Sequence, residues 1–369
     1  MVNVSAKIKL YPTPEQELIL RETMLGYAEV CNHVSKWVFE NGAKKLPKAT
    51  EVNAALYHGI RAWTKITSGH VQNTFRTVLA RYKTNKSNGH EFSQVEFRYE
   101  CDLVWNRDYA LFDDGVFSIA TTQGRQKMSF EVKGMEKYFD KTWKFGGAKI
   151  VNKFGKWFLH VGMGKEFEES PIENVMGIDL GINHIATTYD SNGKTKFYRG
   201  GEVKDYRGKK KALRRQLQIK QTPSARKRIK KIGNRESGYV KDVNHRITKT
   251  LVSQAPKGTL FVLEDLTGIR NATEKVRTKH RYVSVSWAFF EFRKMLEYKA
   301  KMYGHKVVCV SPKYTSQDCP KCGHREKSNR DKANHRFCCK KCQYKSNDDR
   351  IGAMNLFWKG IEHLREQGA

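Results

Sequence analysis

The sequence predicts an α+β protein of several domains, in which a long helical stretch and an antiparallel barrel or meander precede an α/β domain with a metal-binding ribbon. Short alternating segments flank a long helical stretch in the N-terminal half, and strands alternate with helices from Glu173 onward. Two Cys-x-x-Cys pairs lie near the C-terminus. With 369 residues, of which 39% are hydrophobic, the chain is long enough for two or three cores.

The N-terminal half contains the signals for the helical stretch and for the barrel or meander. Residues 7–11 alternate like an edge strand, and a helix is expected to begin at Thr13, because a proline follows this capping residue and Gln16 stands three positions later. Apolar residues at helical spacing continue to about residue 95. Strands are then expected at 94–99, 110–112, 116–119, 127–132, 148–151 and 156–161, with turns at Asp113 to Gly115 and Asn152 to Gly155.

The C-terminal half should form the α/β domain. A meander of three strands is expected first, followed by helices, an apolar strand, a long helix that ends at Gly304, and another strand. The strands are expected at 175–181, 185–189, 196–198, 259–264 and 306–310, and the long helix from about Ser286 to Tyr303.

The charge of the chain indicates a polyanionic partner. Lys and Arg number 69 against 38 acids, a formal net charge of +31 that repels itself unless an anionic polymer neutralises it. Nucleic acid is therefore the expected partner, with a merely soluble basic surface as the alternative. No run of about 18 apolar residues occurs and the N-terminus lacks the apolar core of a signal peptide, so an intracellular protein without a membrane partner is expected.

Positive charge is concentrated between residues 204 and 235, which hold 14 Lys or Arg and one acid, Asp205. Intermittent apolar residues predict two basic helices broken at Thr222-Pro223. The alternative is a solvated helix face, but the concentration of charge favours a surface that follows a phosphate backbone. The predicted contacts are Lys209, Lys210, Lys211, Arg214, Arg215, Arg226, Lys227 and Arg228.

Three acids are placed where they can meet. Asp179 and Glu264 each end an apolar strand, and Asp349 opens a helical stretch near the C-terminus. Strand ends line one rim of an α/β sheet, so these carboxylates are predicted to hold two Mg²⁺ ions about 4 Å apart over a phosphodiester. Taken singly, Asp179 could equally be a turn residue, Glu264 a cap of the following segment and Asp349 an N-cap. Asp348 and Asp265 are the rival positions for these acids.

The cysteines predict a second, different metal site. Cys319 and Cys322 are separated by sixteen residues from Cys339 and Cys342, which is the spacing of a four-thiolate zinc ribbon. Four protein ligands leave no position for water, so this single zinc is predicted to be structural. Cys338 is left out because its spacing is less usual.

Together, these motifs resemble TnpB, the family of RNA-guided DNA endonucleases encoded by bacterial insertion sequences, and its descendants, the miniature type V CRISPR effectors. The resemblance rests on residues 9–16, 177–181, 262–266, Trp287 with 298–300, 314–317 and 349–356. It implies a RuvC-like RNase H-fold nuclease at 173–315 and 347–369 that encloses the zinc ribbon at 316–346. It also implies a wedge barrel at 1–12 and 96–172, around a helical recognition domain at 13–95.

The resemblance further implies the roles of individual residues. The catalytic triad is Asp179, Glu264 and Asp349, because the family motif selects Asp349 over Asp348. Ile351 departs from the asparagine of many relatives. A short duplex motif beside the target would be read by a recognition helix, for which His70, Gln72, Asn73 and Arg76 are candidates, with a solvated helix face as the alternative.

The predicted activity is Mg²⁺-dependent hydrolysis of DNA, directed by a guide RNA from the protein's own genetic element. The expected partners are guide RNA, duplex DNA and the displaced single strand, with one chain per RNA, in the bacterial cytoplasm at the nucleoid. The alternatives are a miniature CRISPR effector, a catalytically weak RNA-guided repressor and a DDE-type transposase, which shares the RNase H fold and the acid triad.

Overall fold

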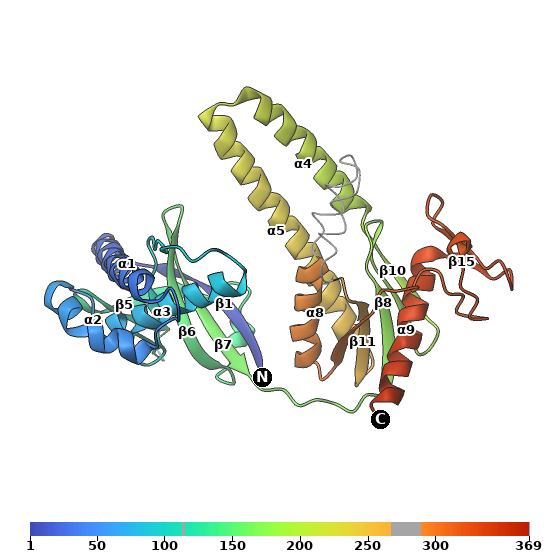
Figure 1. Ribbon diagram of the computed structural model, residues 1–369, viewed down its shortest axis with the longest axis horizontal. Coiled ribbons are helices and arrows are strands. Elements are labelled where there is room, and N and C mark those ends of the chain that lie inside the picture. The colour runs from blue at the N-terminus through green and yellow to red at the C-terminus, as the bar shows by residue number, and fades with distance from the viewer. Residues whose placement is uncertain (113–114, 267–288, 369) are drawn as a thin grey trace. The chain divides into compact units, whose positions relative to one another are not determined.

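The computed structural model describes residues 1–112, 115–266 and 289–368. The chain divides into two compact units, Met1–Glu166 and Phe167–Ala369 (Figure 1). Each unit has its own sheet, so each is described separately.

Three helices of the first unit are α1 (Pro14–Asn41), α2 (Ala49–Trp63) and α3 (Ser68–Ser87). The predicted start of α1 is confirmed, because the Thr13 side chain accepts a hydrogen bond from the backbone N–H of Gln16, and the Gln16 side chain accepts one from the backbone N–H of Thr13. Tyr82 of α3 hydrogen-bonds Ser35 of α1 inside the bundle, which ties the two helices together.

The sheet of the first unit is an antiparallel, nearly closed barrel in the order β2-β6-β7-β1-β5-β4-β3. One edge strand, β3, reaches across to β6 beside the other edge, where the Tyr109 hydroxyl donates to the carbonyl of Gly146. The strands are β1 (Val2–Tyr11), β2 (Asp102–Leu103), β3 (Tyr109–Leu111), β4 (Val116–Thr121), β5 (Gly124–Glu131), β6 (Lys144–Lys153) and β7 (Lys156–Lys165).

The strand predicted at 94–99 is wrong. These residues have no strand partner, and helix side chains satisfy their backbone instead. The Val95 N–H donates to the hydroxyl of Tyr82, while Asn32 exchanges two hydrogen bonds with the N–H and C=O of Phe97. The alternating pattern therefore reflects a segment laid along α1 and α3, with Phe97 buried.

The second unit is built on a five-stranded sheet in the order β10-β9-β8-β11-β12. The first three strands of the chain order form the predicted antiparallel meander, and β11 and β12 run parallel to β8. The strands are β8 (Asn174–Asp179), β9 (His184–Asp190), β10 (Thr195–Arg199), β11 (Thr259–Glu264) and β12 (Lys306–Val310).

Helices cover both faces of this sheet. On one face α5 (Pro223–Gln254) and α8 (Phe289–Met302) pack against apolar side chains that include Ile178 and Phe261. On the other face α9 (Asp348–Glu366) packs through Leu356 and Phe357 (Figure 1). Gly177 allows this close approach, because a Cβ there would lie 2.1 Å from the carbonyl oxygen of Ala353.

The predicted long helix corresponds to α8, and its stop at Gly304 is confirmed by the positive φ of 73° at that glycine. Its expected start at Ser286, and Trp287 of the family motif, lie outside the described residues. The same is true of the first two residues of the turn predicted at Asp113.

The basic segment forms a helical hairpin of α4 (Gly201–Lys220) and α5, broken at the predicted position (Figure 1). Gln221 adopts a left-handed conformation, and the Thr222 side chain caps α5. Leu217, Ala225 and Ile232 form a small core between the two helices. The two predicted basic helices therefore form and pack against each other through this small core.

A three-stranded ribbon lies between β12 and α9 in the chain. Its strands are β13 (Arg330–Asp331), β14 (Arg336–Cys338) and β15 (Lys345–Asn347), and they pair antiparallel. The ribbon core contains Cys319, Phe337 and Cys339 together with Ile351 and Met354 of α9, so the ribbon is seated on that helix.

Candidate active site

Asp179 and Glu264 end neighbouring parallel strands. The register pairs Leu263 of β11 with Ile178 of β8, so the next residue of each strand reaches the same rim of the sheet. Ligands of open α/β sheets bind at this rim, beyond the carboxyl ends of the strands. The sequence expectation that the two acids share one rim is confirmed by this register.

Asp349 reaches the same rim from the first turn of α9. The Asn347 side chain caps the helix by accepting from the backbone N–H groups of Asp349 and Arg350. One turn later, a Cβ at Gly352 would lie 2.9 Å from the carboxyl carbon of Asp179. A glycine is thus needed where α9 meets the strand-end acid, and the helix start lies directly against Asp179.

The fold disfavours the ionised forms of Asp179 and Glu264. The pKa of Asp179 lies well above its ordinary value because of burial first, and then because of the negative charges of Glu264 and Asp349. Burial also raises the pKa of Glu264, although a hydrogen bond from Thr315 opposes the shift. Acids crowded in this way at a strand-end rim are typical of functional sites and fit a divalent cation with oxygen ligands.

The rival acid Asp348 has other partners. Its carboxylate accepts from Arg330 Nε at 2.9 Å and lies 3.5 Å from His335 Nδ1. Asp349 raises the pKa of Asp179 more strongly than Asp348 does. This geometry supports Asp349 over Asp348 as the third member of the group.

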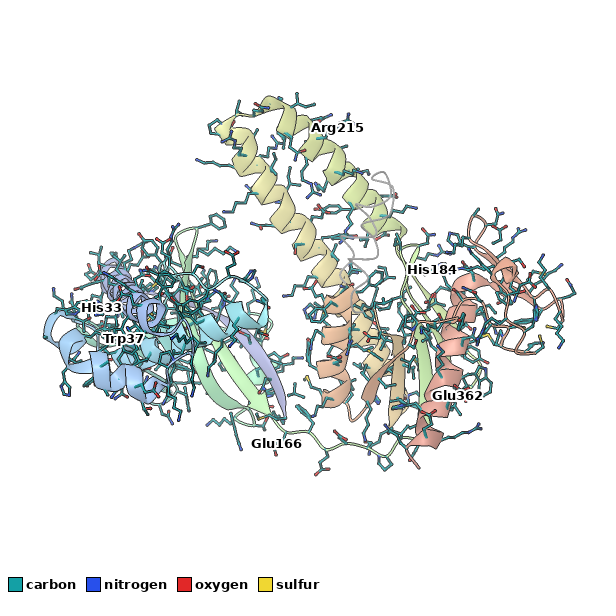
Figure 2. The ribbon with its side chains drawn as sticks, in the orientation of Figure 1. His33, Trp37, Glu166, His184, Arg215 and Glu362 are labelled. Carbon is teal, nitrogen blue, oxygen red and sulfur yellow. The ribbon has the colours of Figure 1, made fainter. Side chains whose placement is uncertain are left out.

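Two side chains that hold these acids were not singled out from the sequence. His184 Nδ1 lies 2.7 Å from Oδ2 of Asp349, and the Thr315 hydroxyl donates to Glu264 Oε1 at 2.5 Å. Thr315 stands four residues before Cys319, so its position in the motif was a usable signal. The sequence carried no signal for His184, because only the folded meander brings β9 beside the start of α9 (Figure 2).

The four predicted cysteines come together in the ribbon. The Sγ atoms of Cys319 and Cys342 lie 3.6 Å apart, as do those of Cys322 and Cys339, and all four sulfurs lie within 4.8 Å of one another. The Cys338 thiol donates instead to Gln343 Oε1 at 3.7 Å. The cluster of four could bind zinc, and Cys338 is not part of it.

The hairpin exposes most of the predicted phosphate contacts. In Figure 2, Arg215 lies on the α4 arm. Arg214 is different, because it donates to the buried carboxylate of Glu236 at 2.5 Å, beside the equally buried Arg207. Its role in holding the hairpin together was not predicted. The other predicted contacts that are exposed are Lys209, Lys211, Arg215, Arg226, Lys227 and Arg228, while Lys210 is partly covered.

Two of the four residues predicted to contact bases are buried and cannot do so. His70 is completely buried, against the ring of Tyr27, and burial lowers its pKa. Asn73 is also buried, and its side chain donates to the carbonyl of Asp102. These two residues belong to the core between α3 and the barrel, whereas Gln72 and Arg76 are exposed.

Among the helices that the structure describes, none is long and apolar enough to span a bilayer.

Family models match two segments of the chain. Residues 159–268 match a model described as a probable transposase, OrfB_IS605, and residues 289–356 match the TNB domain of Cas12f1-like proteins. The first segment contains Asp179 and Glu264, and the second contains Asp349 and all four cysteines of the cluster.

Curated relatives cover different shares of the chain. A Cas12f1 endodeoxyribonuclease from Sulfoacidibacillus thermotolerans is 27% identical, over 85% of this chain and 82% of that protein. A putative RNA-guided DNA endonuclease, InsQ, from Escherichia coli is 30% identical over 57% of this chain and 56% of its own length. A TnpB-like protein from Methanocaldococcus jannaschii is 29% identical over 62% of this chain and 84% of its own length. The match to the Syntrophomonas palmitatica Cas12f1 spans only 49% of that protein.

Solved structures show the same fold. A Cas12f1–sgRNA–target DNA complex superposes with a TM-score of 0.66 at 16% identity, covering 92% of this chain and 82% of the other. The mini-RNA-guided endonuclease CRISPR-Cas_phi3 gives 0.60 at 12% identity, covering 96% and 92%. These likenesses show the fold of the chain. By sequence, the chain is similar to TnpB-like proteins and to Cas12f1, and the resemblance predicted from the sequence motifs is confirmed.

Proposed function

We propose that this chain is an RNA-guided DNA endonuclease that binds a guide RNA, recognises a short duplex motif beside its target and hydrolyses DNA phosphodiesters. The observation that carries the proposal is the convergence of Asp179, Glu264 and Asp349 on one rim of the second sheet. Relatives named as RNA-guided or CRISPR-associated DNA endonucleases support the guided reading.

The second unit would be the nuclease, with a RuvC-like RNase H fold. A meander of three strands joined to two parallel strands, with helices on both faces, supports this assignment. The barrel and helices of the first unit would be the wedge at 1–12 and 96–172 and the recognition domain at 13–95. The nuclease at 173–315 and 347–369 would enclose the ribbon at 316–346.

The carboxylate oxygens of the triad fit Mg²⁺, which prefers oxygen ligands. Two such ions would supply an activated water and stabilise the leaving 3′ oxygen. The chain's own residues prepare the site, because Thr315 orients Glu264 and His184 orients Asp349 through the hydrogen bonds described above. Hydrolysis by this route needs no covalent enzyme intermediate.

The four cysteines would hold one structural zinc. Four thiolates fill a tetrahedral coordination sphere and leave no site for water. The position of the cluster, beneath Ile351 and Met354 of α9, supports a role in fixing that helix.

The exposed basic residues of the α4–α5 hairpin would bind the phosphate backbone of guide or target. Gln72 and Arg76 remain candidates for reading the duplex motif. We expect one chain per RNA, acting on DNA at the bacterial nucleoid.

The test is cleavage by the chain purified together with its RNA. The RNA is sequenced, a matched duplex flanked by a randomised segment is supplied, and cleavage is followed with and without Mg²⁺. Glu264→Gln should abolish cleavage. Asp265→Asn should retain it, because the neighbouring Asp265 is exposed and lies 3.6 Å from Arg293.

Each alternative gives a different result in this assay. Guided binding without Mg²⁺-dependent cleavage would indicate a repressor, and joining of DNA ends without RNA would indicate a transposase. Equal cleavage by the parent and Glu264→Gln would refute the triad.

A further inference from the structure

An exposed aromatic ring lies next to the carboxylate rim. Tyr314 immediately precedes Thr315, whose hydroxyl donates to Glu264 Oε1, so the backbone of Tyr314 lies within roughly 10 Å of that carboxylate. Tyr314 is 46% exposed, and its φ of 67° is in the left-handed region that is unfavourable for a tyrosine. Strained residues of this kind persist only where the surrounding structure holds them.

The loop around Tyr314 is held from α9. The Asn355 side chain donates to the carbonyls of Thr315 and Asp318 at 2.7 and 2.9 Å. Lys359, one turn further on, donates its ammonium hydrogens to two more carbonyls of the loop. The same helix that presents Asp349 thus fixes the backbone on both sides of Tyr314.

The ring is also held by a fixed cation. The Arg325 guanidinium lies 3.9 Å from the centre of the Tyr314 ring, and Asp318 accepts two hydrogen bonds from it, at 2.6 and 2.9 Å. The two hydrogen bonds to Asp318 therefore hold Arg325 against the ring, while nearly half of Tyr314 stays exposed to solvent.

The surroundings attract a polyanion. Residues 311–345 contain ten Lys or Arg and three acids. A rigid, partly exposed ring in such a setting has the two features of single-strand binding sites, a stacking surface and a positive groove for the backbone.

We propose that Tyr314 is the platform on which a base of the DNA strand stacks as that strand passes to the carboxylate rim. The proposal rests on the proposed function for the identity of the strand, and adds a binding subsite on the ribbon side of Glu264. Stacking fixes the nucleotide without reading its sequence, because every base has an aromatic face.

The experiment measures base stacking separately from phosphate contacts and from cleavage. Full-length protein in Mg²⁺-free buffer is titrated with fluorescent ten-nucleotide oligothymidine and with an abasic ten-mer of equal charge. The ratio of the two dissociation constants isolates the contribution of the bases. Tyr314→Gly deletes the ring and suits the left-handed backbone, and Tyr314→Phe keeps the ring. Tyr303→Gly removes a tyrosine of equal exposure directly after the C-terminal end of α8.

The parent should prefer the oligothymidine, and Tyr314→Gly should reduce that preference by roughly five- to 150-fold. Tyr314→Phe and Tyr303→Gly should leave it unchanged. An unchanged preference in Tyr314→Gly, with an unchanged circular dichroism melt, would overturn the proposal and leave the ring as packing for Arg325. Because no cleavage is measured, loss of the nuclease function would not produce this result, and stacking can hold if cleavage fails.

Discussion

Replacing Asp179 by asparagine should stabilise the protein when no divalent cation is present. The fold raises the pKa of this carboxyl through burial and through the charges of Glu264 and Asp349, so its ionised form is unfavourable in the folded state. A group of this kind contributes most to stability below its unfolded pKa, and the contribution is lost as the pH rises through the folded pKa. The substitution removes the unfavourable charge at neutral pH.

The ordinary pKa of the group is 3.8, and each pKa unit corresponds to about 1.4 kcal/mol, so the raised pKa weakens the fold at pH 7 by at most about 4 kcal/mol. We expect Asp179→Asn to raise the free energy of unfolding by about 1–4 kcal/mol at pH 7. The gain should shrink as the pH is lowered, because the parent carboxyl then takes up its proton in the folded state.

The assay is urea unfolding followed by circular dichroism between pH 5.5 and 8, in buffers cleared of divalent cations by resin, because a soluble chelator would also compete for zinc. Added Mg²⁺ should stabilise the parent, by about 2.7 kcal/mol at a hundred times its dissociation constant, and the variant less. Asp205→Asn is the control, since this exposed acid lies in the basic helix α4 and its loss should be neutral or slightly unfavourable. A variant no more stable than the parent at pH 7, or a gain that grows toward low pH, would refute the reasoning.

Three further predictions concern the cysteine cluster, the contact between α9 and Asp179, and the basic hairpin. Cys322→Ser should reduce bound zinc and cleavage together, while Cys338→Ser should change neither; elemental analysis and the cleavage assay decide this. Gly352→Ala should cost about 1–3 kcal/mol and most of the cleavage, because its Cβ would clash with Asp179, while Gly238→Ala, with nothing within 4 Å, should retain activity in the same unfolding and cleavage assays. Glu236→Gln should destabilise the hairpin by about 1–3 kcal/mol, seen as faster amide hydrogen exchange in α4 and α5, because it removes the buried negative charge beside Arg207 and Arg214.

The elements that the sequence predicted well have local causes. The capping box at Thr13, the break at Thr222-Pro223 and the cysteine spacing all act within a few residues, so the chain carries the whole signal. The strand ends at Asp179 and Glu264 were also predictable, because apolar runs mark the strands and the parallel arrangement then brings their ends together.

The failures have causes that are distant in the sequence. Residues 94–99 alternate like a strand, but their backbone is hydrogen-bonded by side chains of α1 and α3 and not by a neighbouring strand. His70 and Asn73 are polar, yet they lie in the core, and no periodicity distinguishes a buried polar residue from an exposed one. His184 became a partner of Asp349 only because β9 folds back beside α9.

The departure at Ile351 now has a structural reason, and it links the cysteine cluster to the carboxylate group. Successive residues of α9 face different neighbours, because each step along a helix turns by about 100°. Gly352 faces Asp179, Ala353 meets Gly177 in the sheet, and Ile351 is completely buried in the ribbon core with Cys319 and Cys339. An apolar side chain at 351 therefore anchors the helix to the ribbon only two residues from Asp349. In the proposed function, loss of zinc would loosen that anchor and, through it, the placement of the third carboxylate. The ribbon would then contribute to catalysis by position, although a four-thiolate cluster leaves no open coordination site.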